Sequence, residues 1–100
     1  MTLDTIAQSQ SKPDFIEIDV EGAELAVLQG AENLMLEHRP TFYAEIGTSV
    51  FSACSDVVRK KGCRILGHDG QPTERPDRAN YFFVHETRDH MLRAILQFAL

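Results

Sequence analysis

The sequence has few cysteines, few basic residues and no long apolar run. Its two cysteines, Cys54 and Cys63, are nine positions apart, and no CxxC or Cys/His pattern has the spacing of metal ligands. Both lie in apolar patterns, so we predict buried, reduced thiols and a cytoplasmic protein without a metal site. The residues before Pro13 contain no apolar signal-peptide core.

Positive charge is outnumbered, with 10 Lys and Arg against 15 Asp and Glu and a net charge of −5. Nucleic acid is excluded as a partner, because binding phosphates requires a basic face. The one basic run, residues 59–61, is typical of a helix C-terminus. The longest apolar tract, residues 91–100, is interrupted by Arg93 and Gln97 and is shorter than the ~20 residues of a membrane span. Neither nucleic acid nor a membrane is therefore expected as a partner.

The apolar residues that are present alternate between strand and helix periodicities. One hundred residues can form one small domain. The patterns predict strands at 15–20, 41–46, 63–67 and 80–85, and helices at 23–36, 50–60 and 87–99. Gly30 is expected to divide the first helix, a Gly47-Thr48-Ser49 segment to cap the second, and Gly62 to end it.

This order of elements predicts the α/β fold class. Strands separated by helices favour a parallel sheet. The last two strands are joined instead by a polar loop with Asp69-Gly70 and two prolines. Such a loop indicates a hairpin, so one strand is expected to run antiparallel.

Residues 14–31 are the most informative stretch, because a strand pattern leads through Glu21-Gly22 directly into a helix. Residues 18–24 read Ile-Asp-Val-Glu-Gly-Ala-Glu, and residues 28–31 read Leu-Gln-Gly-Ala. These runs resemble the hallmark of the FkbM-type family of S-adenosylmethionine-dependent methyltransferases. The resemblance covers roughly residues 2–85, supported by Thr2-Leu3-Asp4 and Arg39-Pro40. It departs at Glu17, where the family usually has lysine, so a charge beside the acidic cluster is reversed.

The resemblance implies the C-terminal half of a Rossmann-like methyltransferase sheet, mostly parallel with a terminal antiparallel strand. Residues 1–100 would be a partial FkbM-type domain, with a core at about 14–85 and a C-terminal helix at 86–100. In this family a glycine-rich turn in the first half of the fold holds S-adenosylmethionine, and this sequence has no glycine before Gly22. We therefore expect no cofactor-binding residue in this chain, and no activity from the chain alone.

Carboxylates gather where the first two predicted strands end. Carboxyl ends of parallel strands meet at one edge of a sheet, about 4.8 Å apart, so these acids are expected to share one cleft. Asp19 and Glu21 are the predicted catalytic residues, which would orient an acceptor hydroxyl or remove its proton. Glu24, Glu45 and His85 are the predicted substrate-binding residues. Alternatively, the acids cap a helix N-terminus or hold Mg²⁺.

The leading functional prediction is a fragment of an S-adenosylmethionine-dependent methyltransferase that methylates a hydroxyl of a sugar or small metabolite. The alternative is a non-catalytic α/β module. Such a module would pair with a partner chain, or with a second copy, through the exposed edge of strand 15–20. It could instead bind a ligand in the acidic cleft. A truncated gene and a natural short protein are both compatible with the sequence.

Overall fold

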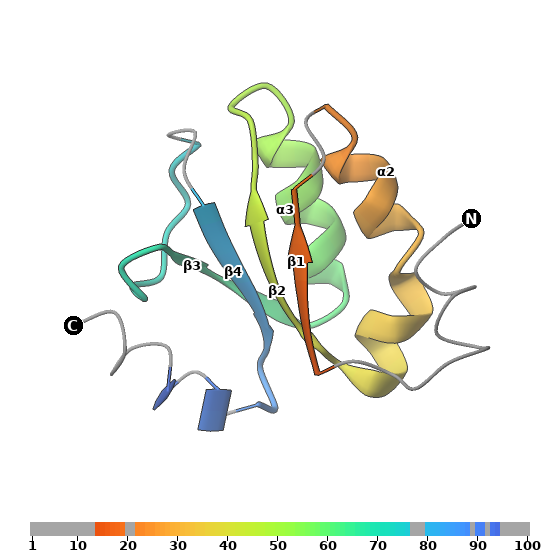
Figure 1. Ribbon diagram of the computed structural model, residues 1–100, viewed down its shortest axis with the longest axis vertical. Helices are drawn as coiled ribbons and strands as arrows, with labels where there is room; N and C mark the ends of the chain where they lie inside the picture. The colour runs from red at the N-terminus through yellow and green to blue at the C-terminus, as the bar shows by residue number, and fades with distance from the viewer. Residues whose placement is uncertain (1–13, 20–21, 77–79, 89, 92, 95–100) are drawn as a thin grey trace.

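The computed structural model describes residues 14–19, 22–76, 80–88, 90–91 and 93–94. The elements are β1 (Phe15–Ile18), α2 (Glu24–Gln29), the π-helix η1 (Leu34–His38), β2 (Thr41–Glu45), α3 (Phe51–Lys60), β3 (Cys63–Gly67) and β4 (Asn80–His85) (Figure 1). Both strands after α3 have the predicted bounds. Of the predicted last helix, residues 90–91 and 93–94 are helical, residues 87–88 are not, and residues 89, 92 and 95–99 lie outside the described residues.

The four strands form one mixed sheet in the order β1-β2-β4-β3. Strands β1 and β2 are parallel, whereas β4 is antiparallel to both β2 and β3. The α/β prediction is confirmed, but the expected mostly parallel pairing is corrected to one parallel pair among three. The reason is that β4 follows a loop instead of a crossover helix, so it returns antiparallel and inserts between β2 and β3. Strands β1, β2 and β3 still share one direction.

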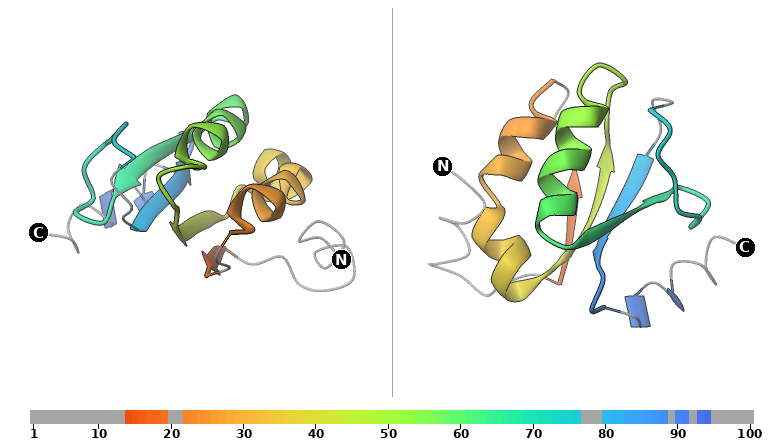
Figure 2. Two further views of the ribbon diagram at one scale, coloured as in Figure 1. Left: turned by 90° about the horizontal axis from the view of Figure 1, so that it is seen from above. Right: turned by 180° about the vertical axis from the view of Figure 1, so that it is seen from behind.

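Helices α2 and α3 cover the same face of the sheet (Figure 2). Alternating strand residues point into this layer, where Phe42, Phe83 and Tyr81 are almost fully buried. The helices contribute Leu28, Cys54 and Val58, as their 3.6-residue periodicity requires; the full cluster also contains Ile18, Ala31, Met35, Ala44, Ile46, Phe51, Cys63 and Ile65. This single apolar layer holds the strand ends in register.

The first predicted helix is divided, as expected, near Gly30. Helix α2 ends at Gln29, and the chain resumes helical geometry before η1. The π-helix ends at Arg39, whose φ is +61° and whose N–H donates to the Leu34 carbonyl at 2.7 Å. Pro40 follows, and a residue before proline avoids α-helical angles.

Helix α3 confirms one predicted boundary and corrects the other. At its end, Gly62 has a φ of +84° and donates its N–H to the Arg59 carbonyl. At its start the N-cap residue is Val50, which has no side-chain hydrogen bond, so the expected cap from residues 47–49 is wrong. The chain enters α3 through backbone turns instead.

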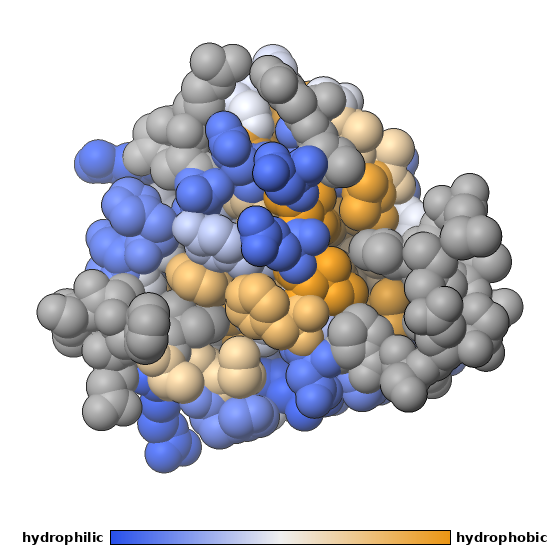
Figure 3. Space-filling model, in the orientation of Figure 1, coloured by the Kyte–Doolittle hydropathy of each residue, from blue (hydrophilic) through white to orange (hydrophobic). Residues whose placement is uncertain are grey.

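Neither α2 nor α3 covers the second face of the sheet (Figure 2), which faces the viewer in Figure 3. Phe15 is 49% exposed there, and the half-buried rings of Tyr43 and Phe82 lie 4.6 Å apart. Met91 packs on a small cluster of Leu66 and Val84 on β3 and β4. We call this surface the open face. No described helix is long and apolar enough to cross a membrane.

Candidate functional site

The carboxyl ends of β1, β2 and β3 lie at one edge of the sheet, which we call the carboxyl edge. The parallel register pairs Glu17 with Tyr43 and ends with Ile18 opposite Ala44; continued by one residue, it would set Asp19 beside Glu45. The antiparallel register then pairs Glu45 with Asn80. Asp19, Glu45 and Asn80 therefore form a row on the open face, with about 4.8 Å between strands. We call it the acid–amide row.

The row is accessible from solvent. Asp19 and Glu45 are both exposed, and Asn80 is half-buried. The two glycines that follow these strands, Gly22 and Gly47, have no other atom within 4 Å of where a Cβ would be. Hydrophilic residues lie in the upper middle of the open face in Figure 3, toward this edge. A ligand can thus approach the carboxylates over bare backbone.

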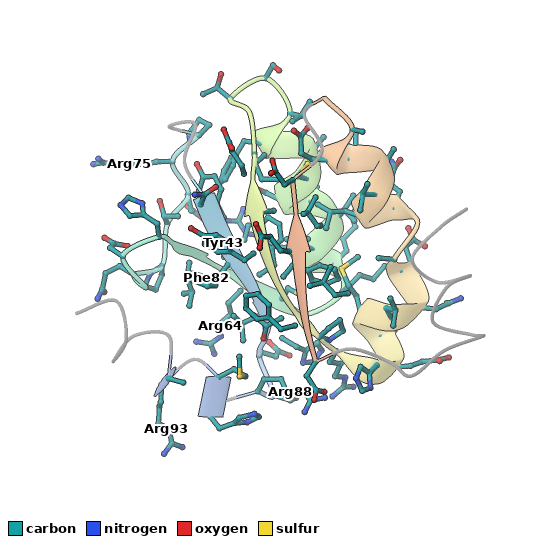
Figure 4. All side chains as sticks on the ribbon, in the orientation of Figure 1. Tyr43, Arg64, Arg75, Phe82, Arg88 and Arg93 are labelled. Carbon is teal, nitrogen blue, oxygen red and sulfur yellow. The ribbon has the colours of Figure 1, made fainter. Side chains whose placement is uncertain are left out.

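An aromatic surface lies directly below the acid–amide row. Tyr43 and Phe82 occupy the next row of the sheet, between Glu17 on β1 and Leu66 on β3. Figure 4 shows the two aromatic side chains together on the open face. The arrangement offers hydrogen-bond acceptors at the edge and flat apolar rings beside them, which suits a ligand with one polar and one apolar side.

Glu24 does not belong to this row. Its side chain is buried, with 5% exposure, and its Oε1 accepts a hydrogen bond of 3.0 Å from the Gly22 N–H. Gly22 has a φ of +84°, so the carboxylate closes a left-handed turn ahead of α2. The geometry gives Glu24 a structural role, which was the alternative for these acids. Glu21 lies outside the described residues.

His85 lies at the opposite end of the sheet. Because β4 is reversed, its first residue pairs with Glu45 and its last, His85, pairs with Cys63 at the start of β3. The five steps along β4 separate His85 from the row by about 17 Å. The expectation that His85 faces the acidic cleft is therefore corrected, and the cause is the reversal of the strand.

Around His85 the polar groups bond to one another. The Thr87 N–H donates to His85 Nδ1 at 3.1 Å, and the Thr87 hydroxyl lies 2.8 Å from the same nitrogen. Arg39 Nη1 donates to that hydroxyl at 3.1 Å. Burial first, and then the positive charge of Arg39, lower the pKa of His85; the negative charge of Glu86 opposes this shift, and Arg88 adds a smaller lowering effect. We call this group of His85, Thr87 and Arg39 the His85 end.

The two thiols are unreactive at neutral pH. Cys54 and Cys63 are free and buried, as predicted. Burial, aided by the negative charge of Glu24, raises the pKa of Cys54 to about 11. Burial and Glu86 raise the pKa of Cys63 to about 12. Neither thiol is a nucleophile at neutral pH.

Metal binding finds no support in the described part of the chain, where no three His, Cys, Asp or Glu side chains come close enough to hold an ion. The acid–amide row offers two carboxylates and an amide spread over three strands. Its chemistry is that of hydrogen-bond acceptance and proton removal. Asn80 was not among the residues predicted from sequence.

Comparison with protein families gives one match. The family described as the methyltransferase FkbM domain matches residues 1–93. The match begins at residue 1 and does not confirm that only a C-terminal half of the domain is represented. No curated protein and no solved structure matches the chain. Because the match covers nearly the whole sequence, this chain belongs to the FkbM methyltransferase family.

Proposed function

We propose that this chain carries the acceptor side of an S-adenosylmethionine-dependent O-methyltransferase with a Rossmann-like sheet. The observation that carries the proposal is the acid–amide row at the carboxyl edge, in a chain of the FkbM family. Ligands of open α/β sheets bind outside the carboxyl ends of the strands, which is where this row lies. The reversed final strand, inserted next to its neighbours, is the arrangement that the family resemblance implies.

Asp19 has the central role in this proposal. Its carboxylate is exposed at the end of the edge strand, so an acceptor hydroxyl can donate a hydrogen bond to it. The same carboxylate would take up the hydroxyl proton as the oxygen becomes methylated. Glu45 and Asn80 would fix the orientation of the acceptor from the neighbouring strands, and the Tyr43–Phe82 pair would carry its apolar side. The acceptor class proposed is a hydroxyl of a sugar or small metabolite.

The cofactor fits this chain only in part. S-adenosylmethionine supplies a methyl group on a positively charged sulfonium, and two exposed carboxylates suit a cation nearby. A glycine-rich turn that brings backbone N–H groups onto the rest of the cofactor does not occur in the sequence. No residue of this chain is therefore assigned to hold the cofactor. The two buried free thiols support our further proposal of a reducing, cytoplasmic location.

The test uses methyl-labelled S-adenosylmethionine with a panel of hydroxylated acceptors. The whole chain is assayed alone and mixed with a separately produced glycine-rich half of an FkbM methyltransferase domain. We expect label on an acceptor oxygen, as an alkali-stable ether, only in the mixture. Calorimetry should show no useful cofactor affinity for the chain alone. Label on nitrogen or on a carboxylate, or no transfer in either sample, contradicts the proposal.

A second candidate, a pairing module, rests on the two unpartnered surfaces of β1. Among the described strands β1 pairs only with β2, so no described strand bonds to its outer backbone groups. Phe15 of the same strand exposes half of its surface on the open face. An unpaired edge beside exposed apolar area favours addition of another strand, from a second copy or from a complementing chain.

Sedimentation at low and high salt separates this candidate from a self-sufficient domain. When β1 of one copy pairs with β1 of another, Glu17 and Asp19 of the two copies repel each other. Salt at 1 M should screen these charges and strengthen dimerisation. A Glu17→Pro variant should abolish the dimer, because proline blocks strand addition. A monomer that unfolds cooperatively at both salt concentrations contradicts pairing between copies, and a dimer retained by the proline variant contradicts pairing through β1.

A further inference from the structure

A pocket lies at the same carboxyl edge, beside the end of β3. It has a volume of about 240 Å³ and is lined by Gly67, the loop that follows it, and Tyr81 of β4. Gly67 pairs with Tyr81, which pairs in turn with Ala44, the residue before Glu45. The pocket therefore lies two strands, or about 10 Å, from Glu45 and three strands, or about 14 Å, from Asp19, on the side of the sheet that Tyr81 faces.

The walls of this pocket are held by short hydrogen bonds. The Gly67 N–H donates to the Gln71 carbonyl at 2.8 Å, and the Thr73 N–H to the Ile65 carbonyl at 3.1 Å, so the loop adds a partial strand to β3. The Tyr81 hydroxyl donates to the Arg75 carbonyl at 2.6 Å. A pocket with so many fixed backbone contacts is formed before a ligand arrives.

Within this frame the side chains at the mouth have free hydrogen-bonding capacity. Asp69 uses Oδ1 to accept the Gln71 N–H at 3.0 Å, and its second oxygen accepts no hydrogen bond from the described residues. The described ion pairs include neither His68 nor the Arg75 guanidinium. Figure 4 shows Arg75 reaching out from the loop at this side of the sheet. A carboxylate, an imidazole and a guanidinium thus share one small opening.

From this arrangement we infer that the pocket binds a pair of adjacent hydroxyls on the acceptor, that is, a vicinal diol of a sugar or a cyclitol. A hydroxyl both donates and accepts, so a diol can donate to Asp69 and accept from Arg75 at once. A free anion suits the pocket less, because the Asp69 carboxylate lies at the same mouth and repels it. The volume, below the roughly 300–1,000 Å³ of sites for drug-sized ligands, fits one ring.

This inference rests on the proposed function for the word acceptor: a molecule bound in this pocket that also reached Asp19 would span three strands, or about 14 Å, around the carboxyl edge. The acceptor would accordingly be larger than one ring. The binding step is independent of methyl transfer. A diol bound in this pocket without any methylation would remove the proposed function and leave the pocket's ligand class in place.

The test is a titration of the ¹⁵N-labelled whole chain, without a methyl donor, followed by amide chemical shifts. The probes are a methyl pyranoside with adjacent hydroxyls, myo-inositol, the corresponding deoxy sugar without the diol, and inorganic phosphate. We expect saturable shifts at Gly67, Gly70 and Gln71 with the diol probes and none with the deoxy sugar. The relative response to pyranoside and inositol identifies the source of the diol.

Three variants make the test specific. Asp69→Asn keeps the oxygen that closes the turn and removes only the charge, and Arg75→Gln removes the guanidinium from an exposed position; each should weaken diol binding about tenfold. Arg64→Gln, on β3 but outside this pocket, should bind as the parent does. Shifts with phosphate alone, no saturation with any diol, or equal weakening in all three variants overturns the inference.

Discussion

The two ends of the sheet use polar side chains in opposite ways. At the carboxyl edge Asp19 and Glu45 are exposed. At the other end His85 is buried and is bonded to Thr87, which is bonded to Arg39. Exposed carboxylates contribute little to folding, whereas buried, hydrogen-bonded groups stabilise the folded state. The carboxyl edge is therefore a surface available for chemistry, and the His85 end stabilises the domain.

The largest effect should follow from changing the exposed end. In the active mixture, Asp19→Asn should lower kcat by about 10²-fold or more, because a base or positioning group is lost. The melting temperature should hardly change, since the side chain is exposed. Glu17→Gln is the matched control, an acid on the same strand and face but one row further from the edge. Equal losses in both variants, or a stability loss with unchanged kcat, would return Asp19 to a structural role.

The next largest effect concerns two glycines that share a φ of +84°, one at each end. Alanine at either position adopts a left-handed conformation that costs about 1–2 kcal/mol. At Gly62 the new Cβ would also lie 2.8 Å from His85 Nε2, whereas at Gly22 it would meet nothing within 4 Å. Gly62→Ala should therefore lose about 2–4 kcal/mol of unfolding free energy and Gly22→Ala about 1–2 kcal/mol.

Denaturant unfolding of both alanine variants measures this difference. The His85 ring cannot move aside freely, because Thr87 holds its Nδ1. Equal losses at the two glycines would show that the ring does yield and that the His85 end is not rigid. A loss confined to Gly22→Ala would reverse the assignment of the two ends.

A smaller effect is expected from pH. The folded protein lowers the pKa of His85 from its usual 6.5, so folding favours the neutral ring. This stabilisation is complete above pH 6.5 and is lost as pH falls from 6.5 through the lower pKa of the folded state. The unfolding free energy of the parent should thus drop between pH 7.5 and 5.5 by more than that of His85→Gln. Parallel pH profiles for the two proteins would contradict a neutral, buried His85.

Local periodicity was enough to predict the individual elements. The bounds of β3 and β4 match because their short apolar runs end at Gly67 and at the turn after His85. The break near Gly30 and the end of α3 at Gly62 follow from the properties of glycine in a helix and at its end. These features depend on residues that are adjacent in the chain, so they can be predicted from the sequence.

What the sequence did not contain was the order of the strands. Asn80 lies beside Glu45 only because β4 inserts next to β2, and no sequence pattern near Asn80 predicts that pairing. The same reversal moves His85 away from the acids. Glu24 could be separated from Asp19 only by seeing that its carboxylate turns back to the Gly22 N–H. Long-range pairing and side-chain direction decided the site, and both are tertiary properties.

The smallest effect should come from removing one hydroxyl, that of Thr87, at the His85 end. The Thr87 hydroxyl accepts a hydrogen bond from Arg39 and lies 2.8 Å from His85 Nδ1, so it links η1 to the end of β4. Thr87→Val keeps the shape and removes these bonds, and should cost about 1 kcal/mol of unfolding free energy. Thr87→Ser keeps the hydroxyl and should cost less. No comparable loss is expected from Asn80→Ala at the carboxyl edge, because that row is open to water. Denaturant unfolding of the three variants decides the matter: a larger loss for Asn80→Ala than for Thr87→Val would mean that the open end, and not the His85 end, holds the sheet together.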